Sequence, residues 1–200
     1  SPLLGRDNVV ITPHTAFYSV EALDELQAKA AKGVVEAITS NGGEAVLVEA
    51  DISQAALAEA AVNRVIEQWQ GFDILVNNAG TMPTSPIIEG RISDWKRMVD
   101  VNVNGVLHGI GAVLPTMLGQ GTGHIVMIGS IAGRRPFPGG TVYAATKFAV
   151  RALSWGLHLE LGAAHGIRVT DIQPGQVATE LYEGIPESPF KDAWARAWGG

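Results

Sequence analysis

The chain has no cysteine among its 200 residues, which excludes disulfide bonds and thiol chemistry. Charged residues are few, at 17%, and the net charge of −6 argues against a nucleic-acid backbone or an anionic membrane surface as partner. The longest apolar run, near Ile110–Leu118, is short for a bilayer and contains Pro115. The first residues also lack a basic segment followed by an apolar run. We therefore expect a soluble, cytoplasmic protein that forms one domain over residues 1–200.

Glycine is abundant, with 24 residues, but it is missing from the first strand–helix junction. The stretch NVVITPHTAFYS (8–19) has the pattern of a buried strand running into a helix and contains no glycine. Before Asp51, glycine occurs only at positions 5, 33, 42 and 43. The chain therefore lacks, at this junction, the glycine-rich turn that lets backbone N–H groups approach a pyrophosphate.

Short apolar runs alternate with amphipathic helical stretches, which predicts βαβ units and a parallel sheet. The five expected strands cover residues 8–12, 45–51, 72–80, 123–130 and 167–175. Helices are expected at about 19–41, 53–69, 93–118 and 142–164, with a short helix in the tail. The sequence thus predicts an α/β, Rossmann-like three-layer αβα sandwich, with ligands bound at the carboxyl ends of the strands.

Several polar residues fall at those strand ends or on the helices that follow. Tyr143 and Lys147 are four residues apart on a predicted helix, so they share one face. A nearby ammonium favours the phenolate, and we expect it to lower the pKa of Tyr143 toward the range useful for acid–base catalysis. Ser130 is placed to donate a hydrogen bond to a substrate carbonyl. Asn102, beside a glycine-permitted irregularity in a helix, is expected to hold a water with its amide.

Six motifs resemble, in content and order, those of the short-chain dehydrogenase/reductase family. They are AD at Asp51, NNAG at 77–80, VNVNG with Asn102, IGS with Ser130, YAATK with Tyr143 and Lys147, and PGQVAT at 174–179. The serine precedes the tyrosine by thirteen residues, which is the spacing of this family. The resemblance covers about residues 43–187.

This resemblance implies reversible hydride transfer between NAD or NADP and a small carbonyl or alcohol. Tyr143 would be the proton donor and acceptor, Lys147 would lower its pKa and bind the nicotinamide ribose, and Ser130 would orient the substrate carbonyl. Asn102 would support a proton-relay water. The implied cofactor contacts are Asp51, Ile52, Asn78, Ala79, Gly80, Tyr143, Lys147, Pro174, Gly175, Val177 and Thr179. No metal is implied, and the five histidines show no ligand spacing.

Residues 1–40 resemble instead the C-terminal segment of D-2-hydroxyacid dehydrogenases. In that family the histidine of the TPH segment, here His14, is the acid–base residue, but its arginine and glutamate partners have no counterpart here. We interpret the chain as a chimera or fusion: a βα unit over 1–42 grafted onto a short-chain dehydrogenase-like core over 43–200 that is truncated at its C-terminus. The predicted strand order is then 2-1-3-4-5, as in flavodoxin.

Three functions follow from this interpretation. The first is an NAD(P)-dependent oxidoreductase of the short-chain type, whose cofactor binding and activity are weakened by the loss of the glycine-rich turn. The second is a non-catalytic chimeric or designed α/β scaffold. The third is a flavodoxin-like anion or nucleotide binder, in which Thr15 and Ser19 hold a phosphate at the start of the first helix.

The surface offers fewer signals. Met98, Trp155 and Leu159 lie on the two long predicted helices that this family uses for dimers, and they either form a homodimer contact or belong to the core. Arg134 and Arg135 are interpreted as part of a solvated loop.

Overall fold

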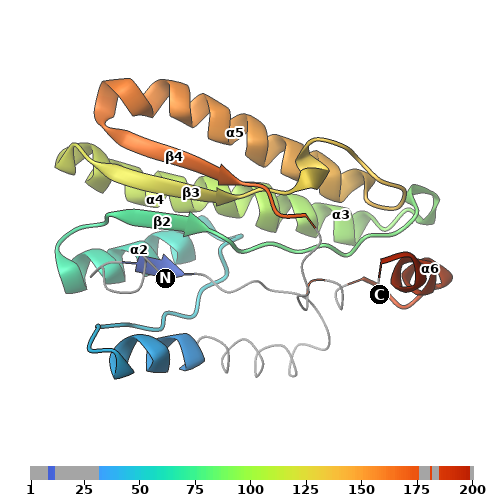
Figure 1. Ribbon diagram of the computed structural model, residues 1–200, viewed down its shortest axis with the longest axis horizontal. Helices are drawn as coiled ribbons and strands as arrows, with labels where there is room; N and C mark the ends of the chain where they lie inside the picture. Colours follow the sequence, from blue (N-terminus) through green and yellow to red (C-terminus); the bar gives the residue numbers. More distant parts are fainter. Residues whose placement is uncertain (1–8, 12–31, 176–180, 182–184, 199–200) are drawn as a thin grey trace.

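A parallel sheet forms the centre of the protein in a computed structural model that describes residues 9–11, 32–175, 181 and 185–198. Its strands are β1 (Val9–Ile11), β2 (Ile74–Asn77), β3 (Gly123–Ile128) and β4 (Ile167–Ile172). They lie in the order β1-β2-β3-β4. One row of the register runs from Val10 through Leu75 and Ile125 to Val169. The carboxyl ends of all four strands therefore lie at the same edge of the sheet (Figure 1).

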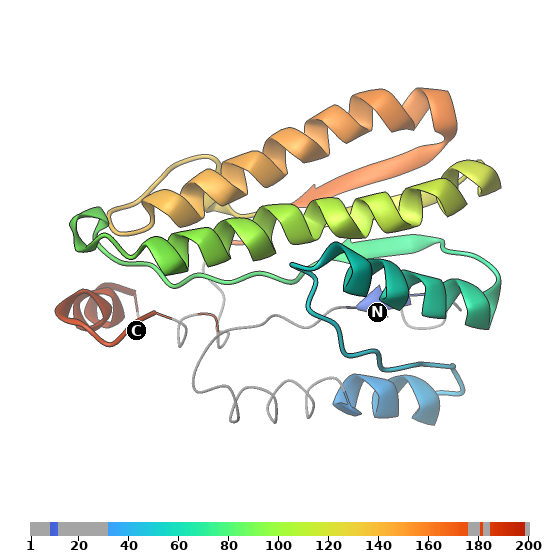
Figure 2. The same ribbon diagram turned by 180° about the vertical axis from the view of Figure 1, so that it is seen from behind.

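Three helices lie side by side on one face of the sheet (Figures 1 and 2). They are α2 (Ala55–Trp69), α4 (Gly105–Gln120) and α5 (Thr141–His165). The remaining helical elements are η1 (Ile87–Glu89), α3 (Ile92–Val99), the π-helical turn η2 (Asp100–Asn104), η3 (Ile131–Gly133) and α6 (Pro189–Trp198). Residues 32–40 are also helical.

The core fills the space between this helical layer and the sheet. Side chains along β3 alternate between buried and half-buried, so Ile125 and Met127 face the helices and are fully buried. Val113 and Met117 of α4 are equally buried against them. The sequence pattern thus produces one apolar interface that holds β2, β3 and β4 beneath α4 and α5.

Two glycines let α4 approach the segment before α2 and the end of β2. A Cβ atom at Gly105 would lie 2.7 Å from Cδ1 of Ile52, and one at Gly109 would lie 2.9 Å from Oδ1 of Asn77. A larger residue at either position would require the Ile52 or Asn77 side chain to move. These glycines interrupt the apolar sequence pattern without interrupting the helix.

The α/β class and the parallel Rossmann-like sheet are confirmed, but the expected second strand is wrong. Residues 43–50 form no strand, and Leu47 and Val48 are exposed. The run AVLVEAD has no partner beside it, because the described part of the sheet ends at the three residues of β1. The described strands therefore do not form the five-stranded order 2-1-3-4-5, although the four that are present keep their expected sequence across the sheet.

The helical stretch Ile92–Gln120 is longer than the apolar run noted in the sequence. By length and composition it would suffice to cross a membrane, and it is the single stretch of that kind among the described residues. A core helix passes the same test, and here Val106, Ile110 and Val113 contribute to the interface with the sheet. This location explains its apolar composition.

Candidate active site

The predicted catalytic residues lie at the carboxyl edge of the sheet, around the start of α5. Ser130 lies two residues after the end of β3 and caps η3, with its Oγ accepting a hydrogen bond from the Ala132 N–H at 3.0 Å. The Ile131 N–H donates to the Pro174 carbonyl at 3.0 Å, which ties the segment after β3 to the segment after β4. The serine is therefore held by both neighbouring loops.

Tyr143 lies in the first turn of α5 and is almost completely buried, with 6% of its surface exposed. It belongs to an apolar cluster with Met82, Met98, Ala132, Ala144 and Ile185. Burial raises the pKa of Tyr143 above its ordinary value of 10, and a hydrogen bond with the Ser130 side chain acts in the opposite direction. The expectation of a lowered pKa is wrong for this structure.

Lys147 does not offset the effect of burial on the pKa of Tyr143. Its Nζ lies 5.8 Å from the centre of the Tyr143 ring and donates a hydrogen bond to the Ile128 carbonyl at 2.9 Å. The side chain is buried, which lowers the pKa of Lys147 to about 8, while the charge of Asp171 raises it. Helical spacing places Lys147 and Tyr143 on one face, but the lysine head group is directed to the end of β3.

Asn102 lies in the π-helical turn, where the Gly105 N–H donates to the carbonyl of Asp100, five residues earlier. Its Oδ1 accepts from the Thr81 N–H at 2.8 Å, and its Nδ2 donates to the Thr81 carbonyl at 2.9 Å and to Thr146 Oγ1 at 3.1 Å. Both polar atoms of the amide thus have protein partners. The side chain therefore connects the loop after β2 to α5, and its support of a proton-relay water stays a prediction.

Asp51 and Ile52 precede α2 and lie near the π-helical turn. The Asp51 carboxylate accepts hydrogen bonds from the Ser53 N–H at 3.0 Å, the Ser53 hydroxyl at 2.7 Å and the Gln54 amide at 3.1 Å. Burial raises the pKa of Asp51, but these hydrogen bonds and the charge of Arg97 outweigh it and leave the pKa below the ordinary value. Asp51 is therefore ionised at neutral pH.

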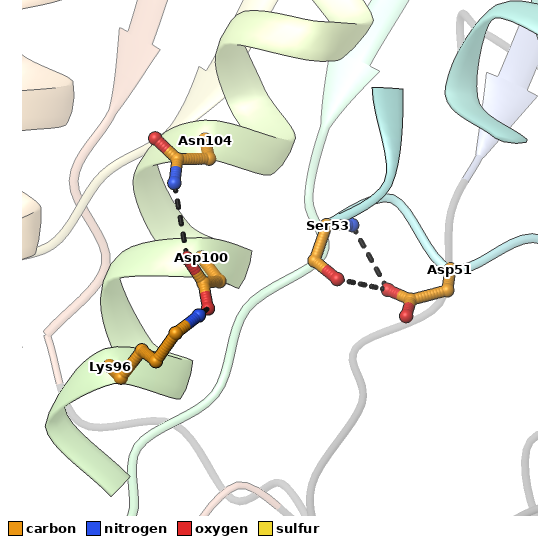
Figure 3. A network of polar contacts seen from close by, with 5 residues as sticks. All are labelled: Asp51, Ser53, Lys96, Asp100 and Asn104. Carbon is orange, nitrogen blue, oxygen red and sulfur yellow. Dashed lines mark hydrogen bonds and ion pairs between the residues drawn. The ribbon is translucent and has the colours of Figure 1, made fainter. Parts of the chain in front are cut away.

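A polar cavity separates Asp51 from the helix that carries Asn102. Figure 3 shows Asp51 and Ser53 on one side, facing Lys96, Asp100 and Asn104 on the other. Lys96 forms an ion pair with Asp100, whose second oxygen accepts from the Asn104 amide at 3.2 Å. The cavity is lined by Asp51, Ser53, Ser93, Lys96, Arg97, Asp100 and Val101.

The other predicted cofactor contacts fall at the same edge. Asn78 follows β2, and its N–H donates to the Val76 carbonyl at 3.0 Å, while Ala79 and Gly80 are buried. Pro174 and Gly175 follow β4. Val177 and Thr179 lie outside the described residues, as do His14, Thr15 and Ser19. The structure thus brings the described members of the set to one side of the molecule.

The sequence analysis did not identify two polar residues that lie at this site. Thr146 is buried and donates to the Tyr143 carbonyl at 2.7 Å, so it connects Asn102 to the tyrosine turn. Asp171 lies on the same face of β4 as Ile167 and Val169, and its charge acts on Lys147. A charged residue at a position where the alternation of IRVTDI would place an apolar one was the sequence signal for it.

Two surface expectations are also resolved. Met98 belongs to the core cluster around Tyr143, whereas Trp155 and Leu159 are strongly exposed. Arg134 and Arg135 are exposed, as expected for a solvated loop, and Nε of Arg134 also donates a hydrogen bond to the Gln173 side chain.

Comparison with known proteins shows which family shares this sequence. The family model described as short chain dehydrogenase matches residues 14–189. The chain belongs to the short-chain dehydrogenase family. The match begins within the first forty residues, so it is longer than the motifs indicated. The grafted origin of residues 1–42 and the single-domain division remain predictions.

Individual short-chain dehydrogenases resemble the chain over most of its length. An uncharacterized oxidoreductase of Listeria monocytogenes is 40% identical, over 77% of this chain and 62% of its own length. A 3-alpha-(or 20-beta)-hydroxysteroid dehydrogenase of Mycobacterium bovis is 42% identical, over 75% and 57% respectively. The crystal structure of a Burkholderia phymatum short-chain dehydrogenase/reductase in complex with NAD has a TM-score of 0.79 at 29% identity, covering 86% of this chain and 66% of that one. The chain thus spans about three fifths of the curated relatives that it matches.

Proposed function

We propose that the chain carries the catalytic residues of an NAD(P)-dependent oxidoreductase, which transfers a hydride between the nicotinamide and a small carbonyl or alcohol. The observation that carries the proposal is the arrangement of three side chains at the carboxyl edge of the sheet. Tyr143 and Lys147 are both buried, one helical turn apart on α5, and the Ser130 side chain acts on the pKa of Tyr143. Membership of the short-chain dehydrogenase family supports this reading of the site.

The donor groups at this edge fit the nicotinamide end of the cofactor. Lys147 has three N–H donors and uses one on the Ile128 carbonyl, which leaves two for the hydroxyl groups of a ribose. Beyond Asn78, the chain after β2 continues with the small residues Ala79 and Gly80, and beyond Gln173 the chain after β4 continues with Pro174 and Gly175. When bound, NAD(P) supplies the carbon that accepts or donates the hydride.

The protein's own groups would handle the proton. Burial holds Tyr143 in its protonated form at neutral pH, so its hydroxyl can donate a proton to a carbonyl oxygen that gains charge during reduction. The Ser130 hydroxyl would orient that oxygen. The Lys147 ammonium would then stabilise the tyrosinate that remains, and in the oxidative direction the tyrosinate would take the proton back.

Binding of the dinucleotide by these 200 residues is proposed to be weak. No glycine-rich turn precedes Asp51, so several backbone hydrogen bonds to the pyrophosphate would be missing. Hydrogen bonds to charged groups contribute about 1.5–3 kcal/mol each, and every 1.4 kcal/mol corresponds to about tenfold in affinity. We therefore expect turnover to be slow and dependent on high cofactor concentrations.

The proposed substrate is a small molecule, with no nucleic acid or membrane as partner, in keeping with the net charge of −6. We also propose a cytoplasmic location and, from the exposed Trp155 and Leu159 of α5, a homodimer. Among relatives, the hydroxysteroid dehydrogenase makes steroid ketones reasonable members of a first substrate panel.

Calorimetric titration with NADH and NADPH, followed by a ketone reduction assay, tests the proposal. We expect weak but saturable binding, and we expect Tyr143→Phe to abolish turnover while leaving cofactor binding unchanged. Lys147→Met should weaken both binding and turnover, whereas Lys32→Met, at an exposed position, should affect neither. Absence of binding at millimolar cofactor would instead support the non-catalytic α/β domain.

A further inference from the structure

Asp171 places a carboxylate beneath the helix that carries the catalytic residues. In the register of the sheet Asp171 is the partner of Met127, which is fully buried against the helical layer. Neighbouring residues in register share one face of a parallel sheet, and α5 packs over β4 on that face. The Asp171 side chain therefore points from the sheet toward α5.

The surroundings of this carboxylate are specific. Its Oδ2 accepts a hydrogen bond from the Gln173 amide, and Gln173 in turn accepts one from Arg134. Its Oδ1 is buried and has no hydrogen-bond partner within the described structure. Gly129 makes room for it, because a Cβ atom at that position would collide with Oδ1. A buried, partly unsatisfied carboxylate is costly unless an opposite charge lies nearby.

Lys147 supplies that charge. Its Nζ is held on the carbonyl of Ile128, the residue directly before Gly129, and Asp171 is the acidic group whose charge raises the pKa of Lys147. The other ionisable groups facing this region are Tyr143 and Arg151 on α5 and Arg134 after η3. Among the described residues here, Asp171 is thus the one anion positioned to offset the burial of Lys147.

We propose that Asp171 is a positioning residue that keeps Lys147 as a cation on the Ile128 carbonyl, and that Gln173 and Arg134 hold Asp171 in place. The catalytic consequence rests on the proposed oxidoreductase function, but the charge pairing does not. An Asp171→Asn protein would retain a side chain of the same size while losing the charge. Lys147 would then be more easily neutralised, and both ribose binding and stabilisation of the tyrosinate would weaken at neutral pH.

Titration of Lys147 in the cofactor-free protein tests the pairing. The ¹³Cε signal of this lysine, assigned with Lys147→Arg, is followed against pH in lysine-labelled protein. We expect Asp171→Asn to move its midpoint down by about one pH unit. Asp192→Asn, at an exposed position of α6, should leave the midpoint unchanged. An unchanged midpoint in folded Asp171→Asn protein would overturn the proposal.

A second variant serves if Asp171→Asn does not fold. Gln173 holds the Asp171 carboxylate, so Gln173→Ala should also move the Lys147 midpoint down. An unchanged midpoint in both variants would equally contradict the pairing. In an activity assay, the loss of rate at high pH should begin at lower pH in Asp171→Asn. A wild-type protein without turnover would remove the oxidoreductase proposal alone, since both titrations are made without cofactor.

Discussion

At the scale of single residues, Lys147 makes the stability of the protein depend on pH. Its pKa is about 8 in the folded protein, against an ordinary value of 10.5. Between these values the unfolded chain binds more protons than the folded one, so the free energy of unfolding rises with pH across this window. The slope approaches about 1.4 kcal/mol per pH unit at most. The raised pKa of Tyr143 acts in the opposite sense, but only above pH 10.

We therefore expect wild-type protein to gain stability relative to Lys147→Met as the pH rises from about 7 to about 9.5. Urea unfolding at each pH measures the free energy of unfolding of the wild type and of Lys147→Met. The profile of Lys32→Met should run parallel to that of the wild type, because Lys32 is exposed. A constant difference between wild type and Lys147→Met would contradict the burial of a cation at this position.

Much of the residue-scale chemistry could be predicted, because helical periodicity alone places Tyr143 and Lys147 on one face. The direction in which the pKa of Tyr143 is shifted could not be predicted from the sequence. It depends on how deeply Met82, Met98 and Ile185 bury the ring. It also depends on the Ile128 carbonyl, which accepts a hydrogen bond from Lys147 Nζ. These groups come from separate elements, so the spacing of residues within one helix does not predict that they lie close together.

At the scale of elements, Asn102 joins the π-helical turn to the loop after β2 and to α5. Asn102→Ala would remove three hydrogen bonds and leave the buried backbone N–H and carbonyl of Thr81 without these partners. We expect a loss of about 2–4 kcal/mol in the free energy of unfolding, measured by chemical denaturation. Asn63→Ala, on the exposed face of α2, is the matched control and should change it by less than about 0.5 kcal/mol. Similar losses in both variants would show that the amide does not brace the site.

Helices were more predictable than strands. The expected helices at 53–69 and 142–164 agree closely with α2 and α5, because each carries its own apolar stripe and backbone partners. A strand needs a neighbour to receive its hydrogen bonds. The apolar residues at 45–48 meet the local requirement, but no described strand lies beside them, and they remain outside the sheet.

At the scale of the whole molecule, α5 presents Trp155 and Leu159 to the outside, with 65% and 69% of their surfaces exposed. They are four residues apart and therefore adjacent on one helix face. We expect this face to be covered in a homodimer, as exposed apolar patches often are. Sedimentation should find a dimer for the wild type and a monomer for Trp155→Glu.

Leu57→Glu is the matched control for that measurement, because Leu57 is an exposed apolar residue on α2. It should leave the dimer intact. A monomeric wild type, or a dimer that persists in Trp155→Glu, would contradict the assignment of this face.

The order of the strands also bears on how the chain folds. Each strand pairs in parallel with the next one along the sequence, so every ladder joins residues far apart in the chain, such as Val9 with Ile74, Leu75 with Ile125 and Val126 with Thr170. A long loop must close before the first hydrogen bond of each ladder can form, and such high contact order slows folding. The segment from β2 to β4 encloses α4 and α5 and has the larger interface, whereas β1 adds only three residues. This topology favours assembly of the part from β2 to β4 first, with β1 docking onto an edge that already exists.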